Sequence, residues 1–353
     1  MKAWPLLIVL AACPSPPKKP PAPLADPAGD RDTGGDLVWR RIMELQDDIL
    51  KSYERDEPPE FDNAMVPPEI GTVRIGVGPG DVLVGAEQAR APSRWPLDVE
   101  AEIPREPRSK RLEIHLSQDR QAAWTSDEIS WRITMCGRIA VIPLRMTALF
   151  ARDGDRWVPV FEHLSFAQLA RATREGEKLP RGFQTAVSDR DLADELSRVL
   201  SPLLRRALDK SPKVIATGND VMVLGPGISA EWHGSEVLNA RLMPGTEPMR
   251  LEDRRVGVVA RNPRAANLAY WVGNLTADLP ARPGIPAGKG YFRATFVFEK
   301  RLNEWVIVQA HVSQPIDDEG LASAVFGTSL ISPKPLAISC DDGSRKPKKA
   351  AQN

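Results

Sequence analysis

Histidine and cysteine, from which metal and nucleophilic sites are most often built, are scarce in this sequence. The four histidines, His115, His163, His233 and His311, lie far apart, and the three cysteines lack the spacing of a zinc site. The motifs G-x-S-x-G, GxxxxGKS/T and H-E-x-x-H are absent as well. We therefore expect no metal site and no cofactor, and no chemistry of the kinds that those motifs serve.

Neither sign of charge is in excess, because 47 Lys and Arg residues balance 47 Asp and Glu residues. A groove that follows nucleic-acid phosphates normally leaves a basic excess, so we expect no nucleic-acid partner. Long apolar runs are also lacking: the first one, residues 6–12, is much shorter than the roughly 20 residues that cross a bilayer. With 353 residues, the chain is long enough for two ordinary domains.

The first residues, MKAWPLLIVLAAC, resemble the signal and lipobox of bacterial lipoproteins, with small residues directly before Cys13. The resemblance implies that residues 1–12 are removed and that Cys13 carries lipid, which would anchor the chain to a membrane. Pro14 in place of an aspartate favours the outer membrane, facing the periplasm. The alternative is a plain secretory signal with an incidental cysteine. Cys136 and Cys340 are expected to be free, although an envelope disulfide between them is the other option.

Proline is concentrated directly after Cys13, with seven prolines between residues 14 and 27. Such a segment buries little apolar surface, so residues 13–35 are predicted to form an extended, solvated tether. At about 3.1 Å per residue it would reach roughly 60 Å from the membrane. The C-terminal tail, residues 326–353, is basic near its end and is predicted to be largely disordered.

Residues 145–165 and 293–313 align without a gap and are identical at eight of 21 positions. The identical pairs include Arg145/Arg293, Thr147/Thr295, Trp157/Trp305, His163/His311 and Ser165/Ser313. Upstream of each segment lie an amphipathic helix pattern and a glycine–proline turn, VGPG at 77–80 and LGPG at 224–227. The distance from the turn to the closing histidine is 85 residues in one copy and 86 in the other. The chain is therefore predicted to be an internal duplication of an α+β unit.

The helix, the G-P-G turn and the last hairpin with W-x5-H-x-S resemble the NTF2-like superfamily, most closely its SnoaL-like and DUF4440-type branches. The resemblance covers residues 36–170 and 186–325. It implies two tandem cone-shaped domains, each a curved antiparallel sheet wrapped around a long helix. Members often dimerise through their sheets, so we expect the two halves to pack as a pseudo-dimer within one chain, through their Val-rich or Trp-bearing faces.

Strand alternation predicts that tryptophan, histidine and serine share one face of the last strand in each copy. Whether the arginine joins them depends on the hairpin register, which the sequence leaves open. If it does, the patch would suit a carboxylate or another small anion. The alternative is a set of hydrogen-bonded core residues. The candidate ligand-binding residues are Arg145, Trp157, His163, Ser165, Arg293, Trp305, His311 and Ser313.

The expected function is non-catalytic: binding of a small molecule or an envelope partner by a membrane-anchored lipoprotein. The alternative is an enzyme of the SnoaL or ketosteroid-isomerase type that acts on a small apolar substrate, with His311 or Asp127 as acid or base. Asp127 and its neighbour Glu128 should point to opposite sides of their strand, and a solvated edge is the expected home of both. A third reading is a structural envelope protein whose cones are filled by side chains.

Overall fold

The computed structural model describes residues 33–55, 72–85, 105–135, 138–183, 190–205, 221–227, 230–234, 248–259, 266–283, 285–317, 320–321 and 324–325. The predicted signal peptide, Cys13, most of the tether, the whole tail, Cys136 and Cys340 lie outside these residues. Residues Trp39–Asn353 form one compact unit, which contains both copies of the repeat. None of the described helices is both long enough and apolar enough to span a membrane.

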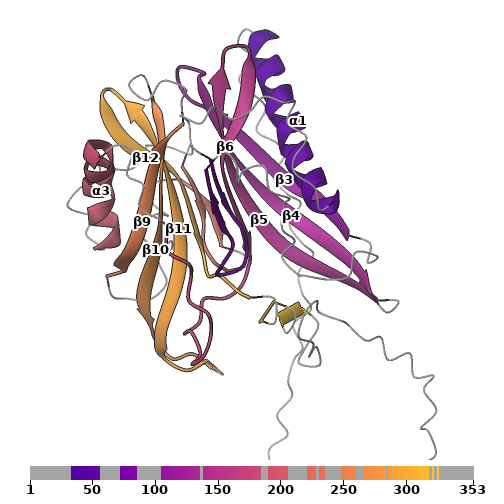
Figure 1. Cartoon of the computed structure of the whole chain (residues 1–353), viewed down its shortest axis with the longest axis vertical. Helices are drawn as coiled ribbons and strands as arrows, with labels where there is room; N and C mark the ends of the chain where they lie inside the picture. The colour runs from indigo at the N-terminus through magenta and orange to yellow at the C-terminus, as the bar shows by residue number, and fades with distance from the viewer. Residues whose placement is uncertain are drawn as a thin grey trace, which may run out of the picture. The chain divides into compact units, whose positions relative to one another are not determined.

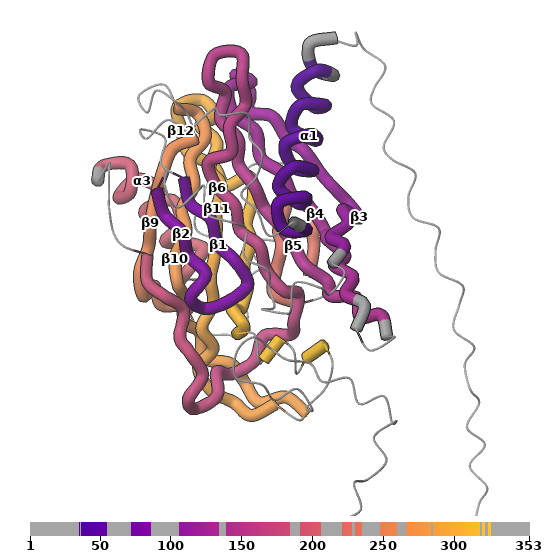
Figure 2. The backbone as a smooth tube through the Cα atoms, turned by 45° about the vertical axis from the view of Figure 1, so that its right-hand side comes forward, coloured from indigo at the N-terminus to yellow at the C-terminus, as the bar shows by residue number. Residues whose placement is uncertain are grey.

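In the described residues, the first half consists of one helix and a six-stranded sheet. Its elements are α1 (Thr33–Arg55), β1 (Val73–Ile75), β2 (Val82–Val84), β3 (Arg105–Leu116), β4 (Ala122–Met135), β5 (Arg138–Asp153) and β6 (Arg156–Phe166). The strand order is β2-β1-β6-β5-β4-β3, and the pairing of β1 with β6 is the parallel one. The β1–β2 hairpin can be followed in indigo in Figure 2.

The second half repeats this arrangement (Figure 1). Its elements are α3 (Arg190–Leu204), β7 (Met222–Leu224), β8 (Glu231–His233), β9 (Arg250–Val258), β10 (Leu268–Leu279), β11 (Gly288–Arg301) and β12 (Glu304–Ser313). The order β8-β7-β12-β11-β10-β9 matches the first sheet strand for strand, and β7 pairs with β12 in parallel. The predicted α+β class and the internal duplication are confirmed, because two distant segments fold with the same topology.

The register of the last hairpin places arginine and histidine on one face in both halves. Thr147 pairs with His163 and Arg145 with Ser165, while in the second half Thr295 pairs with His311. Arg293 pairs with Ser313 in the same way. Directly paired residues of antiparallel strands point to the same side of the sheet. The question that the sequence left open is therefore answered: arginine, threonine, histidine and serine lie side by side.

The two tryptophans, in contrast, lie on the opposite face, so the prediction that they share a face with the histidines is wrong. A β-bulge interrupts the hairpin between Leu149 and Phe150, and its counterpart lies between Val297 and Phe298. The bulge inserts one extra residue into the last strand and shifts the alternation of its side chains. Trp157 consequently pairs with Arg152. In the second half, Trp305 pairs with Lys300, whose ammonium nitrogen lies 5.7 Å from the ring centre.

Each sheet packs a helix on the face that carries the tryptophans. In the first half, Gln46 and Tyr53 of α1 hydrogen-bond to Met146 of β5 and Glu162 of β6. In the second half, α3 contacts β9 and β12 (Figure 1). The opposite face of each sheet, which carries the histidines, is buried as well. Each half therefore has a core between helix and sheet, and a second buried face on the other side of the sheet.

Candidate functional site

The two repeated histidines stack on each other, one from each half. The rings of His163 and His311 lie 4.0 Å apart, tilted by 20°, and neither side chain is exposed by more than 1%. His163 is hydrogen-bonded through Nδ1 to Thr295 (2.9 Å) and through Nε2 to Ser313 (3.0 Å). His311 is hydrogen-bonded in the same way to Thr147 (3.0 Å) and Ser165 (2.8 Å). Every partner belongs to the other half, so the contacts are reciprocal.

Both histidines are held in their neutral form by this environment. Burial lowers the pKa of His163 well below its usual value, and burial lowers the pKa of His311 to about 3. A neutral imidazole has one N–H donor and one acceptor nitrogen, and a hydroxyl group can serve either. The threonine and serine of the opposite half therefore satisfy each ring without a charge. The arrangement is one of satisfied, buried hydrogen bonds.

The repeated arginines reach into the glycine–proline turns of the opposite half. Arg145 donates to the carbonyl oxygens of Gly225 (2.6 Å) and Ala230 (3.3 Å). Arg293 reaches the corresponding turn of the first half, where it donates to the carbonyl oxygens of residues 76, 78 and 79 at 3.2–3.4 Å. Burial lowers the pKa of Arg293 to about 10, which leaves it charged at neutral pH. The two sequence motifs, turn and hairpin, are thus the two sides of one contact.

We call this arrangement the reciprocal joint and define it by four residues from each half: Arg145, Thr147, His163, Ser165, Arg293, Thr295, His311 and Ser313. The two halves pack on each other within the chain, as predicted, through the faces that carry the histidines. The prediction that the Trp-bearing faces form this contact is wrong, because the bulges turn both tryptophans to the opposite side. Six of the eight candidate ligand-binding residues belong to the reciprocal joint, and none of these six is more than 4% exposed. Their ligand-binding role stays a prediction, because their observed partners all lie within the chain.

Between α1 and its sheet, the first half carries buried polar residues. Glu162 of β6 accepts a hydrogen bond from the Tyr53 hydroxyl, and its carboxylate lies 3.4 Å from Arg74 Nε. All three side chains are at most 7% exposed. Burial raises the pKa of Tyr53 well above its usual value, so its hydroxyl stays protonated and donates. Glu162 and Arg74 therefore form a neutral, buried ion pair.

Asp127 of β4 lies in the same region and is fully buried. Its Oδ1 accepts a hydrogen bond from Ser109 (2.8 Å), whereas Oδ2 has no hydrogen-bond partner among the described residues. Nearby, the Thr125 hydroxyl lies 3.3 Å from Gln46 Oε1. Burial raises the pKa of Asp127 to about 6, although hydrogen bonds lower it in part. An acid with this pKa changes its protonation state close to physiological pH.

The sequence predictions about this acid are half confirmed. Asp127 pairs with Met146 on the helix side, and Glu128 pairs with Arg145 on the joint side, so the two acids do point in opposite directions. The prediction of a solvated edge is wrong for Asp127. The β3 strand pairs along the edge of β4, and Gln46 of α1 contacts Thr125 and Met146 beside Asp127, which is fully buried. Strand alternation alone does not show which side a helix covers.

The second half has an apolar interior at the same positions. Asp127, opposite Met146, corresponds to Gly273, opposite Ala294, because the strands pair in the same register. In the same way, Thr125 corresponds to Trp271, Arg74 to Val223 and Glu162 to Ala310. Trp271 packs edge-on against Phe296, with ring centres 5.7 Å apart, and a Cβ on Gly273 would meet that indole ring at 2.4 Å.

The six buried side chains of the first half are referred to below as the polar interior: Gln46, Tyr53, Arg74, Thr125, Asp127 and Glu162. The sequence analysis named Asp127 and missed the other five. A comparison of the two copies position by position signals three of them, since Thr125, Arg74 and Glu162 stand where the second copy has Trp271, Val223 and Ala310.

A separate group of side chains could hold a cation at the edge between the halves. Glu113, Glu231 and His233 present one ligand atom each within 4.8 Å of one another. The guanidinium of Arg111 already lies 2.8 Å from Glu113 and 2.9 Å from Glu231. Burial, and the neighbouring Glu231 carboxyl, raise the pKa of Glu128 in the same group. As it stands, the group is an ion-pair network in which Arg111 supplies the positive charge.

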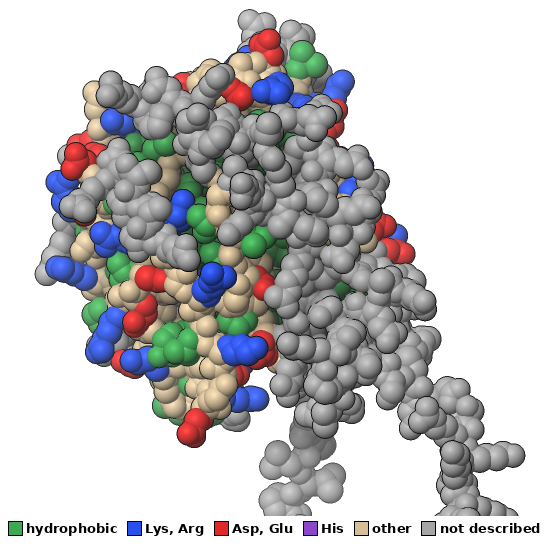
Figure 3. All heavy atoms as spheres, in the orientation of Figure 1, with side chains coloured by type: hydrophobic (Ala, Val, Ile, Leu, Met, Phe, Trp, Pro, Cys, Tyr) green, Lys and Arg blue, Asp and Glu red, His purple; other side chains and the backbone are tan. Residues whose placement is uncertain are grey.

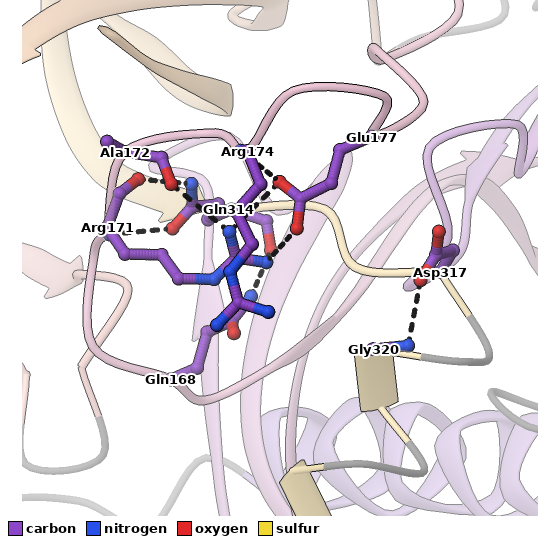
Figure 4. A network of polar contacts seen from close by, with 8 residues as sticks. All are labelled: Gln168, Arg171, Ala172, Arg174, Glu177, Gln314, Asp317 and Gly320. Atoms are coloured by element: carbon purple, nitrogen blue, oxygen red, sulfur yellow. Dashed lines mark hydrogen bonds and ion pairs between the residues drawn. The ribbon is translucent and has the colours of Figure 1, made fainter. Parts of the chain in front are cut away.

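The segment that follows β6 carries another polar network (Figure 4). Arg171 pairs with both carboxylate oxygens of Glu177 (2.9 and 2.6 Å). Gln314, just after β12, exchanges two hydrogen bonds with the backbone of Arg171 (3.0 and 2.7 Å). Gln168 donates to the Gln314 carbonyl oxygen (3.0 Å). These groups bind one another and tie the connection between the halves to the end of the second half.

The surface drawn in Figure 3 mixes charges of both signs. Lys and Arg side chains alternate with Asp and Glu side chains on this face, and the described residues form no large area of one sign. The distribution agrees with the zero net charge of the sequence. The described residues on this face therefore form no charged patch that would suggest a second candidate site.

A comparison with protein families identifies one domain directly. Residues 205–317 match the model of the SnoaL-like domain. The match runs from the end of α3 through β12, and the first half repeats the same strand order and the same hairpin register. The second half of the chain is therefore similar to the SnoaL-like domain, and the first half shares its topology. No curated protein matches the chain.

Several solved structures resemble one half of the chain. The association domain of C. elegans CaMKII is 14% identical over 35% of this chain and 94% of its own, with a TM-score of 0.27. An NTF2-like protein of unknown function from Pseudomonas putida KT2440 is 20% identical over 36% and 92%, with a TM-score of 0.27. A putative ketosteroid isomerase from Parabacteroides distasonis is 17% identical over 38% and 93%, with a TM-score of 0.27. At these values the similarities carry no argument about activity or ligand.

Proposed function

We propose that this protein is a lipid-anchored bacterial envelope protein that binds a small molecule in the polar interior of its first half, while the second half serves as scaffold. One observation carries the binding site: Asp127 is fully buried and its Oδ2 has no hydrogen-bond partner among the described residues, whereas the second copy fills the same region with Trp271 and Phe296.

Comparison of the two copies shows which buried side chains the fold requires. The second half builds the same sheet and helix around apolar side chains, so the fold does not require a buried acid at this position. A buried carboxylate that lacks part of its hydrogen bonding lowers stability by roughly 1–3 kcal/mol or more. Groups of this kind, with a shifted pKa, concentrate at binding and catalytic sites.

The buried position of these residues favours a small molecule over a protein partner as the ligand. A partner binds an exposed surface, whereas each of the six side chains of the polar interior is at most 7% exposed. The reciprocal joint has a supporting role in this proposal. It holds the second half against the face of the first sheet opposite to the one that carries Asp127.

Acid–base catalysis in the same place is the second candidate. A pKa of about 6 places Asp127 close to the value that suits a general acid or base at neutral pH. His311, the other candidate acid or base, has both ring nitrogens hydrogen-bonded within the reciprocal joint. If a reaction occurs, we therefore assign the proton transfer to Asp127.

Native mass spectrometry of the full-length chain tests the binding proposal. We expect a retained small molecule with one copy per chain, which Asp127→Asn loses and which the control Ser197→Ala in α3 keeps. The Ser197 hydroxyl donates only to its own helix, to the carbonyl oxygen of Ala193 (2.6 Å). A ligand that persists in Asp127→Asn would place the site elsewhere.

The membrane anchor is supported by the sequence around Cys13 and is tested separately. Cys13→Ser should move the protein from the membrane fraction to the soluble fraction and remove the mass of the lipid from the mature N-terminus. A variant that still sediments with membranes would contradict the anchor. It would leave the proposal about the polar interior untouched.

A further inference from the structure

The hydrogen bonds of the polar interior leave one acceptor over. The Thr125 hydroxyl donates to Gln46 Oε1 (3.3 Å), and the Gln46 amide donates to the Met146 sulfur (3.1 Å). Ser109 donates to Oδ1 of Asp127, and the Gln46 side chain and the Arg111 backbone also act on this carboxyl and lower its pKa in part. Oδ2 still has no hydrogen-bond partner among the described residues. A ligand that satisfies this buried oxygen must supply a donor of its own.

The charges of the polar interior also leave Asp127 without a counter-ion among the described residues. Glu162 and Arg74 neutralise each other (3.4 Å), and Arg145 lies on the opposite face of the sheet, in the reciprocal joint. An ionised Asp127 therefore gives the polar interior a net charge of one negative unit. A buried carboxylate without a cation is strongly disfavoured, and a positively charged ligand would remove that penalty.

We propose that the ligand of the first half is a small organic cation whose protonated nitrogen donates a hydrogen bond to Oδ2 of Asp127. The inference rests on the proposed function, namely that the polar interior is the binding site. A charge-assisted hydrogen bond is roughly twice as strong as a neutral one, and it satisfies the charge and the free acceptor together. Protonated amines and amidines are the chemical class that meets both requirements.

A bare metal ion fits this place less well than a nitrogen cation. Calcium takes 6–8 oxygen ligands, and magnesium needs a near-octahedral set. The second carboxylate of the polar interior, Glu162, is already engaged by Arg74 and Tyr53. The second half offers neither kind of cation a site, because Gly273 replaces Asp127 there and Trp271 covers the position.

The ionisation of Asp127 makes the proposed binding depend on pH. Burial raises the pKa of this carboxyl to about 6, and a cation binds the ionised form. Binding of a cation should therefore weaken about tenfold between pH 7.5 and pH 5.0, whereas binding of a neutral molecule should not. Four other titratable groups of the described chain lie beside Asp127 or in the polar interior. The charge of Glu128 also raises the pKa of Asp127, and Tyr53, Arg74 and Glu162 pair with one another.

Two probes of nearly equal size and different charge, butylammonium and 1-butanol, test the inference on the full-length chain. Titrations followed by ligand-observed NMR at millimolar concentration give both affinities. We expect butylammonium to bind at least tenfold more tightly than 1-butanol at pH 7.5, and to lose about tenfold at pH 5.0. Asp127→Asn should abolish the preference for the cation, and Ser197→Ala should leave it unchanged.

The outcomes distinguish this inference from the proposed function. If 1-butanol binds as tightly as butylammonium and Asp127→Asn weakens both, the polar interior is a binding site for neutral ligands. The inference that the ligand is a cation is then wrong. If butylammonium shows no saturable binding, the inference is overturned, and native mass spectrometry alone decides on the site. Should Asp127→Asn fail to fold, the pH comparison on the unchanged chain still decides, because a cation affinity equal at both pH values contradicts the proposal.

Discussion

His163 and His311 show at the residue scale how a repeated motif can serve architecture. Each ring stacks on its counterpart and forms both of its hydrogen bonds with threonine and serine of the other half. Duplication placed the same four side chains on both sheets, and a two-fold arrangement lets each set satisfy the other. The pattern R-x-T with H-x-S is therefore best understood as two complementary halves of one contact.

The buried histidines predict a protein that loses stability in mild acid. A histidine whose folded pKa lies below its unfolded value near 6.5 takes up a proton on unfolding, so the free energy of unfolding falls as the pH drops below 6.5. Each histidine contributes about 1.4 kcal/mol per pH unit, and Asp127, with its raised pKa, opposes them by a similar amount below pH 6. Urea unfolding from pH 7.5 to 5.0 should show a net loss of about 1–2 kcal/mol per unit.

His311→Gln is the matched variant for this measurement. Glutamine keeps a donor and an acceptor but does not titrate, so the dependence on pH should become shallower by the share of one histidine. An unchanged slope would mean that the stability of the folded chain in acid is set by other groups.

The arginines of the reciprocal joint should contribute more to the free energy of unfolding than arginines on the surface. Arg293→Met removes a fully buried guanidinium and leaves three turn carbonyl oxygens without their donor, so we expect the free energy of unfolding to fall by about 2–4 kcal/mol. Arg108→Ala, at an exposed ion pair with Glu106, should change it by less than about 1 kcal/mol. Equal effects in chemical denaturation would show that the joint adds nothing to stability.

The sequence predicted residues of the joint but not their partners. Identity between the copies singled out Arg145, His163 and their counterparts, because duplication preserves side chains that must match each other. It gave no information on whether those side chains face a ligand or the other copy. The polar interior was missed for the opposite reason: its residues differ between the copies, and a difference becomes informative only when strand pairing aligns Glu162 with Ala310.

At the scale of elements, the glycine–proline turns and the bulged hairpins work together. Each turn presents its carbonyl oxygens to an arginine from the other half, and each bulge moves the tryptophan away from the face that forms the joint. The helices, the strands and the repeat could be predicted from periodicity and turn residues. The bulge could not, because one inserted residue leaves the local apolar pattern of β6 and β12 unchanged.

The turn of the second half offers a test with a control two residues away. A Cβ on Gly225 would lie 2.9 Å from the Trp232 ring and 3.0 Å from the Ala230 Cβ, whereas a Cβ on Gly227 meets its nearest atom at 3.5 Å. Gly225→Ala should lower the free energy of unfolding by about 1–3 kcal/mol through overpacking. Gly227→Ala should be close to neutral in the same thermal unfolding experiment. The opposite ranking would contradict the packing of this turn.

The whole molecule is a duplicated unit, and the proposed function divides the roles between its copies. Both copies form the joint, and among the described residues only the first copy has a buried acid and an ion pair between helix and sheet. The second copy fills that space with aromatic side chains. The asymmetry agrees with the proposed function, since a scaffold needs only an apolar core.

The reciprocal joint predicts that neither half is stable by itself. Residues 186–325 alone would expose Arg293, His311 and the surrounding apolar face to water. We expect each half expressed singly to be insoluble or unfolded, and the two halves expressed together to assemble into a one-to-one complex, measured by co-purification and circular dichroism. A cooperatively folded second half in isolation would show that the joint joins two independent domains.

The division of roles between the copies is tested most directly by an experimental structure of the full-length chain isolated with its ligand. The account predicts a small molecule between α1 and its sheet, within hydrogen-bond distance of Asp127 Oδ2, and only side chains between α3 and the second sheet. A molecule bound at the stacked histidines or beneath α3, with Asp127 satisfied by the protein itself, would contradict it.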